Sequence, residues 1–228
     1  MASCNGDPTI PPSPATYRVT AILVKNLAAD SAGLYVTLTK SNLTYKKATV
    51  SLGSTTLDTN AAGYFKRFGS AQIKFDSSYI LSIVDGSTFD TTLTIHMPDS
   101  FTLTSPDVRF FSGMSETVSW SPSVSADGYI LATQPPDTAA YDGYEEYVAT
   151  NSGTITPDPF LDASNNRIVG THLILVAAYI GAPVKCPAFF FDIPAQGNPA
   201  DNVASEIIVG RTAGMVIAEP DTIIVAAP

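Results

Sequence analysis

The sequence is poor in the side chains that carry most catalytic and metal chemistry. Its 228 residues include only two histidines, His96 and His172, and two cysteines, Cys4 and Cys186. Neither histidine lies near a Gly-x-Ser-x-Gly elbow, a His-x-x-x-His pair or a Cys-x-x-Cys pair, so the parts of a hydrolase triad or a zinc site are missing. No Gly-rich phosphate loop is present. We therefore predict no enzyme activity, no cofactor and no metal site.

Positive charge is also scarce. The chain has 12 Lys and Arg against 21 Asp and Glu, a formal net charge of −9. Nucleic-acid binding depends on neutralising phosphates, so a nucleic-acid partner is excluded. The residues through Ser105 hold 8 cations and 7 acids, whereas those from Pro106 onward hold 4 cations and 14 acids. This acidic second half is either a solubilising surface or a surface that selects cations or partners.

Long apolar runs and helical patterns are missing too. No run approaches the ~18 apolar residues of a membrane-spanning helix, and no stripe of ten or more residues has a 3.6-residue period. Apolar residues instead alternate with polar ones, as in Tyr17–Leu23, Leu34–Leu38, Tyr79–Ile83 and Leu93–Met97. This spacing is typical of strands with one buried face. The 45% apolar content is enough for a packed core, so we predict an all-β fold.

Turn residues divide the chain into four segments. Residues 5–16 hold four prolines, which favours an extended tether over residues 1–16. Two blocks of about seven short strands follow, over 17–105 and 106–193, and each has the size and rhythm of a β-sandwich. The remaining residues, 194–228, form a tail rich in β segments. We expect two immunoglobulin-like β-sandwiches in tandem with this tail.

The second block has strand motifs of a known family. Glu116-Thr-Val-Ser-Trp120-Ser-Pro-Ser and Ala126-Asp-Gly-Tyr129-Ile-Leu-Ala are followed by His172-Leu-Ile-Leu-Val-Ala-Ala-Tyr179. These segments resemble strands B and C and a late strand of fibronectin type III domains. The resemblance implies that Trp120 and Tyr129 are buried in the core. The stretch from Thr154 to Asn166 departs from the family's usual spacing, which leaves the strand order open.

The first block resembles a different group of sandwiches. Ala48-Thr-Val-Ser-Leu52, Thr56 to Phe65 and Phe75 to Ile83 are similar to the transthyretin-like and carboxypeptidase-regulatory sandwiches of bacterial surface proteins. Asp58-x-Asn60-x-x-Gly63 has the beginning of a calcium loop, but the other ligands of the 12-residue loop are missing. We therefore interpret it as a turn.

The N-terminus bears on the cellular compartment. Ala2-Ser3-Cys4 before the proline-rich segment resembles the end of a processed bacterial lipobox, which implies a lipid on Cys4 and a position outside the cytoplasm. An ordinary N-terminus is the alternative. A disulfide between Cys4 and Cys186 in an oxidising compartment is a third interpretation.

One segment of the second block combines aromatic and acidic residues. Between Asp137 and Tyr147 the sequence places Tyr141, Tyr144, Glu145, Glu146 and Tyr147 close together. Exposed tyrosines beside carboxylates bind sugars or anchor protein partners; alternatively, these rings cover the edge of the sandwich. Glu145 with Glu146, and Asp158 with Asp162, are the carboxylate clusters that could serve glycoside hydrolysis. A hydrolase using the Glu145/Glu146 region is the weakest hypothesis, because these adjacent residues of a strand point to opposite faces.

The C-terminal tail contains three segments rich in branched residues and poor in charge. Unpaired strands of this kind aggregate, so they must pair with this chain's own sheets, as extra edge strands, or with a neighbouring subunit. The candidate assembly residues are Ile207, Ile208, Val209, Met215, Val216, Ile217, Ile223, Ile224 and Val225.

These observations predict a non-catalytic, extracytoplasmic protein of the bacterial cell surface, for display, adhesion or assembly. A protein partner or self-association is expected, and a membrane is contacted only through a lipid at Cys4. A filament subunit that donates its C-terminal strands is one alternative. A carbohydrate-binding module, with Tyr141, Tyr144 and Tyr147 as its platform, is the other.

Overall fold

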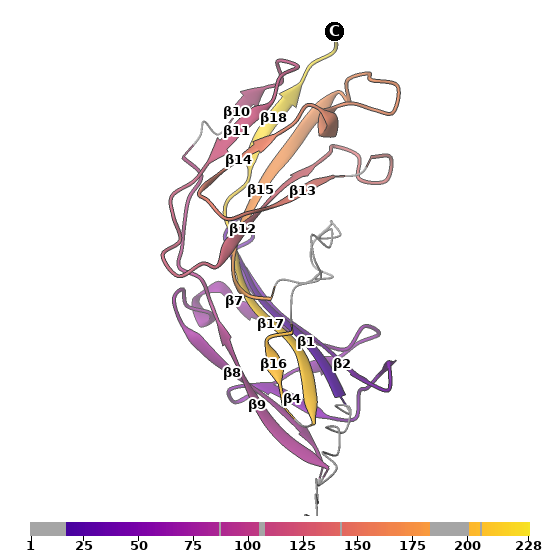
Figure 1. Ribbon diagram of the computed structural model, residues 1–228, viewed down its shortest axis with the longest axis vertical. Coiled ribbons are helices and arrows are strands. Elements are labelled where there is room, and N and C mark those ends of the chain that lie inside the picture. The colour runs from indigo at the N-terminus through magenta and orange to yellow at the C-terminus, as the bar shows by residue number, and fades with distance from the viewer. Residues whose placement is uncertain (1–16, 87, 105–107, 142, 183–200, 206) are drawn as a thin grey trace, which may run out of the picture.

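The computed structural model describes residues 17–86, 88–104, 108–141, 143–182, 201–205 and 207–228. Strands dominate, and the helices in these ranges are two single turns, η1 (Ser70–Gln72) and η2 (Asp158–Phe160). Figure 1 shows an elongated, curved molecule with two halves, each built from two layers of strands. The all-β prediction is confirmed. None of the described helices has the length and apolar character needed to cross a membrane.

The first half packs two sheets against each other. One contains β1 (Tyr17–Asn26), β2 (Ser31–Lys40), β3 (Leu43–Thr44), β6 (Asp58–Thr59) and β7 (Tyr64–Gly69). The other has the order β5-β4-β8-β9, with β4 (Thr49–Leu52), β5 (Thr55–Thr56), β8 (Ser78–Asp85) and β9 (Phe89–His96). The predicted turn near Asn60 is confirmed, because its side-chain oxygen accepts hydrogen bonds from the amides of Ala62 and Gly63.

The second half repeats this two-layer arrangement. Its larger layer contains β10 (Val108–Phe110), β12 (Gly128–Gln134), β13 (Tyr144–Val148), β15 (Gly170–Gly181) and β18 (Asp221–Val225). The smaller layer pairs β11 (Glu116–Ser119) with β14 (Ser152–Ile155). Trp120 is 1% exposed and lies 5.3 Å from the ring of Tyr129. The predicted core positions of Trp120 and Tyr129 are confirmed.

The C-terminal segment joins the two halves. It contains β16 (Val203–Ala204), β17 (Ile208–Ile217) and β18. Strand β17 runs parallel to β1 from Tyr17↔Ile208 to Asn26↔Ile217, and its last five residues also pair with β15, from Ala177↔Ile217 to Gly181↔Ala213. The large layers of both halves thereby form one continuous sheet of 12 strands.

Strands β17 and β18 are interior strands, whereas the sequence analysis expected them at an edge. Strand β17 lies between β1 and β15, and β18 lies between β10 and β15. The unbroken apolar run from Ala213 to Ala218 fits this position, because a central strand buries both of its faces. Residues 213–218 are all buried.

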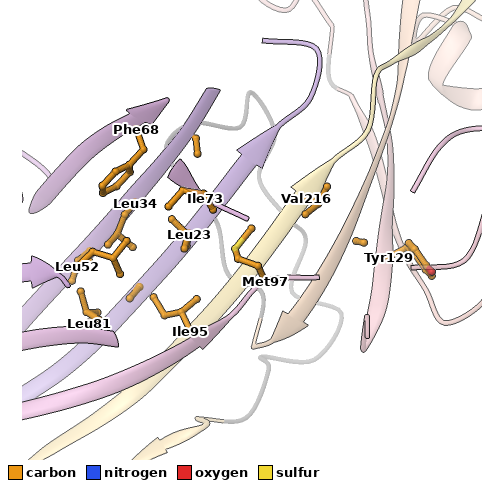
Figure 2. Packing of buried hydrophobic residues seen from close by; sticks show 14 of the residues in the cluster. Leu23, Leu34, Leu52, Phe68, Ile73, Leu81, Ile95, Met97, Tyr129 and Val216 are labelled. Carbon is orange, nitrogen blue, oxygen red and sulfur yellow. The ribbon is translucent and has the colours of Figure 1, made fainter. Parts of the chain in front are cut away.

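One apolar core fills the space between the layers of both halves. Figure 2 shows side chains of the two facing sheets, such as Leu23 and Ile95, pointing toward one another. At the junction, Gly214 lies directly against the backbone of β9, so that a Cβ atom there would overlap the carbonyl oxygen of His96. Glycine therefore permits β17 and β9 to pack closely where the halves meet.

A second apolar cluster lies on the other face of the continuous sheet. It combines residues of β1 and β17 with residues of β12 and β15, namely Ile22, Val24, Met215, Ile217, Ile130 and Ala177. Because these strands belong to different halves, the cluster adds apolar contact across the junction. The halves are thus linked by backbone pairing and by side-chain packing on both faces of the sheet.

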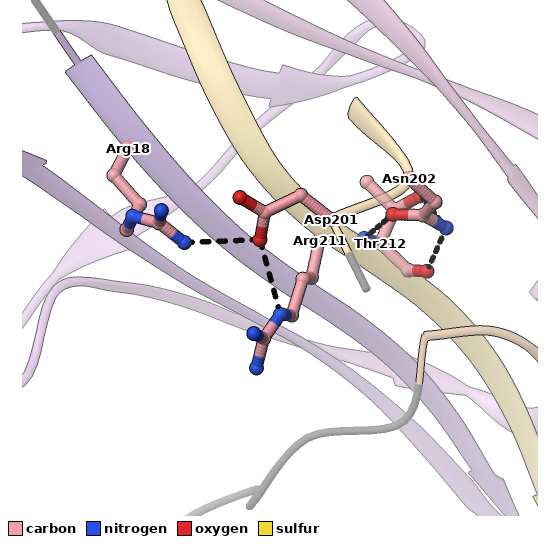
Figure 3. Close-up of polar contacts among 5 residues, drawn as sticks. All are labelled: Arg18, Asp201, Asn202, Arg211 and Thr212. Atoms are coloured by element: carbon pink, nitrogen blue, oxygen red, sulfur yellow. Dashed lines mark hydrogen bonds and ion pairs between the residues drawn. The ribbon is translucent and has the colours of Figure 1, made fainter. Parts of the chain in front are cut away.

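Polar contacts hold the beginning of the C-terminal segment on the sheet. Figure 3 shows the Asp201 carboxylate between Arg18 and Arg211, at 2.9 and 3.1 Å. The Asn202 side chain donates to the carbonyl oxygen of Thr212 and accepts from its amide, both at 2.8 Å. Exposed ion pairs stabilise a fold by only about 0–1 kcal/mol. Their effect here is therefore to set the position at which the segment joins the sheet.

The tandem sandwiches and the β-rich C-terminal segment are confirmed. The bounds 17–105 and 106–193 stay predictions, because the C-terminal strands contribute to both halves. The tether over 1–16, the lipid on Cys4 and the disulfide with Cys186 all fall outside the described residues.

Candidate functional site

A pocket of about 480 Å³ opens in the second half. One wall carries Tyr141, Gly143 and Tyr144, from the end of the loop that leads into β13. The other wall is formed by η2 and the loop after it. Its lining residues are Thr156, Asp158, Pro159, Leu161, Asp162, Ala163 and Ile168. The fold thus brings together two of the predicted candidate tyrosines and the Asp158/Asp162 pair, which are separated in the sequence.

Local hydrogen bonds hold the first wall. The Asp137 carboxylate accepts from the amides of Ala139 and Ala140 at 3.0 and 3.3 Å, which closes the turn before Tyr141. The Tyr144 amide donates to the Thr133 hydroxyl at 3.2 Å, and the Tyr144 hydroxyl donates to Glu146 at 2.6 Å. The Tyr144 hydroxyl is therefore already bonded, while Tyr144 also lines the pocket.

The second wall is anchored in the core. Phe160 of η2 is fully buried, with ring centroids 4.9 Å from Phe111 and 5.2 Å from His172. The Asp162 carboxylate accepts from the amides of Ser164 and Asn166 at 2.8 and 2.9 Å. These bonds lower the pKa of Asp162. Both walls are consequently preorganised, which reduces the entropy cost of binding a ligand.

The tyrosines and acids of β13 do not share one surface. Successive strand residues alternate between faces. Tyr144 packs against the main core, whereas Tyr147 packs against the cluster on the other face, 6.0 Å from Tyr179. Burial raises the pKa of Tyr147 to about 12. Glu145 and Glu146 likewise occupy opposite faces, so Tyr141 and Tyr144 line the pocket without Tyr147.

Two carboxylates, Asp158 and Asp162, line the pocket, and they differ in their contacts with the described residues. The Asp158 side chain makes no ion pair or side-chain hydrogen bond within those ranges, whereas the Asp162 carboxylate is held by its own loop. The Tyr144 ring, Leu161 and Ile168 supply apolar surface. This combination can stack a flat apolar face and accept hydrogen bonds from hydroxyl or ammonium groups.

A second pocket, of about 310 Å³, lies on the large sheet of the first half. Tyr35 and Phe65, with ring centroids 4.7 Å apart, line it together with Arg67. These residues were not predicted from the sequence. Tyr35 and Phe65 lie opposite each other in register on β2 and β7, and this pairing has no signal in the sequence.

Within the described ranges, each histidine is hydrogen-bonded to a hydroxyl or a backbone carbonyl group. His172 is buried in β15, where one ring nitrogen lies 2.9 Å from the carbonyl oxygen of Ile168, and burial lowers its pKa. His96 lies in β9 with its Nδ1 2.8 Å from the Ser78 hydroxyl. Within the described ranges, no three His, Cys, Asp or Glu residues cluster as metal ligands would.

The candidate assembly residues are engaged within this chain. Ile208, Met215, Val216, Ile217, Ile223 and Val225 are buried, and Val209 and Ile224 are half-buried. Ile207 is 44% exposed, but its carbonyl oxygen accepts a hydrogen bond from the Tyr17 amide at 3.0 Å. Donation of these strands to another subunit would require their release from both halves.

The sequence matches no protein-family model, and no curated protein is similar to it. Solved structures with some similarity include the fibronectin(III)-like modules of Clostridium thermocellum CbhA, 13% identical over 92% of this chain and 93% of that chain, with a TM-score of 0.26. The chicken CNTN1 FN1–FN3 domains are 15% identical over 74% of this chain and 62% of that chain, with a TM-score of 0.29. A two-domain fibronectin type III segment of chicken tenascin is 12% identical over 65% and 83%, with a TM-score of 0.26.

Likenesses of this extent carry no argument about function. The sandwich architecture rests on the strand pairings and the core described above. The transthyretin-like resemblance of the first block stays a prediction.

Proposed function

We propose that this protein is a non-catalytic, extracytoplasmic display protein that holds a binding surface away from its N-terminal attachment point. The observation that carries the proposal is β17, which pairs with β1 and β15 at once and so makes one sheet of the two halves. A shared interior strand resists bending at the junction better than a flexible linker does. A protein or another copy of the chain is the expected partner.

Tyr17 and the pocket lie far apart along the strands. Tyr17, the first described residue, pairs with Ile208 at one end of β17. Beyond the other end of β17, Ile174 pairs with Thr133, which pairs with Tyr144. At about 3.3 Å per residue, the path along the strands from Tyr17 to the level of Tyr144 is roughly 40 Å. This distance supports display, with a lipid on Cys4 as the proposed attachment.

Surface labelling tests the display proposal. An antibody against the loop around Tyr141 is expected to label intact cells of the source organism. Labelling that requires permeabilised cells would refute the extracytoplasmic location. Sizing of the full chain then distinguishes a displayed monomer from a self-associating subunit. Truncation after residue 193 is unsuitable for that test, because it removes interior strands from both halves.

Carbohydrate binding is a second candidate function, and the pocket favours it specifically. Tyr141 and the Tyr144 ring offer aromatic surface, and Asp158 offers a carboxylate for hydroxyl groups. Sugar sites combine these two kinds of group. Tyr147 is no longer part of the proposed platform, because it lies on the opposite face of β13.

A glycan array tests this candidate. The protein is expected to bind a limited set of glycans, and Tyr141→Ala and Asp158→Asn are each expected to weaken binding about tenfold. The first removes aromatic contact surface, and the second removes a hydrogen bond to a charged group, which contributes ~1.5–3 kcal/mol. Asp90→Asn, at an exposed position of β9, is the matched control. A blank array, or equal binding by all variants, removes the carbohydrate hypothesis.

A further inference from the structure

The pocket of the second half, called the distal pocket below, has charged lining residues of one sign among the described residues. Asp158 and Asp162 line it, Asp137 forms the turn beside it, and Glu146 is bonded to Tyr144. The sequence has no Lys or Arg between Arg109 and Arg167. Every residue of the first wall, and most of the second, therefore lies in a stretch of the chain that lacks cations.

The two arginines that flank this stretch are engaged elsewhere. The Arg167 guanidinium lies 5.6 Å from the Phe111 ring centroid and donates to the carbonyl oxygen of Ala226 at 3.4 Å. Arg109 donates to the carbonyl oxygen of Thr117 at 2.9 Å and lies near the carboxylates of Glu116 and Asp221. Neither arginine is among the lining residues, and no Lys or Arg in the described part of the chain lines the pocket beside Asp158 and Asp162.

We propose that the pocket selects carbohydrates by charge, so that it binds neutral sugars and, more tightly, amino sugars, and rejects uronic and sialic acids. This inference rests on the carbohydrate function proposed above. A carboxylate such as that of Asp158 accepts hydrogen bonds from a hydroxyl group or an ammonium group, but it cannot donate one to a ligand carboxylate. A ligand carboxylate would approach Asp158 and Asp162 in a pocket that no described Lys or Arg lines, and carboxylates brought close together repel each other.

The first-half pocket shows the opposite chemistry. Tyr35 and Phe65 supply aromatic surface there, as the tyrosines do in the distal pocket, but the charged lining residue is Arg67. Aromatic surface alone therefore does not distinguish the two pockets. The sign of the lining charge does, and it assigns cationic and neutral ligands to the distal one.

The experiment compares three probes of equal length on the full chain: oligosaccharides of glucose, of glucosamine and of glucuronic acid. We expect glucosamine to bind about tenfold more tightly than glucose, and glucuronic acid at least about tenfold more weakly, at low salt. Asp158→Asn should weaken glucose binding about tenfold and glucosamine binding further, so that most of the glucosamine preference is lost. Asp90→Asn should leave all three affinities unchanged.

The outcomes separate the two proposals. If glucose binds and glucuronic acid binds equally well, charge selection is wrong while the carbohydrate function stands. A glucosamine preference that survives both Asp158→Asn and 0.5 M salt also overturns charge selection, since an exposed charge interaction is screened at that ionic strength. If none of the three probes binds, the carbohydrate function itself fails.

Discussion

Gly214→Ala tests whether β17 belongs to both halves. The added methyl group would overlap the carbonyl oxygen of His96 and lie 3.1 Å from the Met97 Cα atom. These are backbone atoms, so no rotamer change relieves the contact, and β9 and β17 must separate. Overpacking of this kind costs about 1–3 kcal/mol, and burial of one methyl group offsets only about 0.8 kcal/mol. Because the neighbour is backbone, we expect the upper end, a net loss of about 2 kcal/mol.

The free energy of unfolding is measured with one probe in each half. Fluorescence of Trp120, the chain's single tryptophan, reports on the second half during urea unfolding. Amide hydrogen exchange in β1 and β2 reports on the first half. Because β17 pairs with β1 and β15, both probes should show the same loss of stability. For a chain of this size, about 2 kcal/mol corresponds to a fall in Tm of roughly 4–8 °C.

Gly69→Ala is the matched control. Gly69 has an ordinary extended backbone (φ −65°, ψ 144°), and a Cβ atom there would have its nearest neighbour, the Gln72 side-chain oxygen, at 3.6 Å. This variant should change stability by no more than about 0.5 kcal/mol. If Gly214→Ala shifts one probe and leaves the other at its wild-type value, the halves unfold independently and the shared-strand argument is refuted.

Two further predictions concern buried ionisable groups of the second half. The Asp221 side chain is 3% exposed and lies 3.6 Å from the Arg109 guanidinium. Asp221→Ala should lower the free energy of unfolding by about 3–5 kcal/mol, because it leaves the buried charge of Arg109 poorly compensated. A thermal melt whose Tm corresponds to a loss of less than about 1 kcal/mol would contradict this prediction. Burial lowers the pKa of His172 in the folded state, so the unfolded chain binds the proton more readily and stability should decline as pH falls through the unfolded pKa of about 6.5. The urea midpoint at pH 5.5 should therefore lie below that at pH 8, and His172→Gln should make this difference smaller. If the midpoint falls by the same amount between pH 8 and pH 5.5 in the wild type and in His172→Gln, other groups cause the effect.

The candidate site was visible in the sequence only in parts. The tyrosine–acid segment around Tyr144 and the pair Asp158 and Asp162 were both recognised, but as separate features. Which tyrosines face the pocket depends on the phase of β13, and whether Asp162 is available depends on the hydrogen bonds of its own loop. Tyr35, Phe65 and Arg67 were missed because they converge only through pairing of β2 with β7.

The alternation of apolar residues with period two was sufficient to predict strands, turns, a buried Trp120 and an all-β chain, because this pattern reflects local geometry and burial. The partners of the strands were not predictable in the same way. Ile208–Ile217 has the composition of a strand wherever it pairs, and backbone hydrogen bonds are the same for every partner. Only the packed tertiary structure, with Gly214 against β9 and apolar residues on both faces of β17, decided that this segment lies between β1 and β15 and unites the two sandwiches.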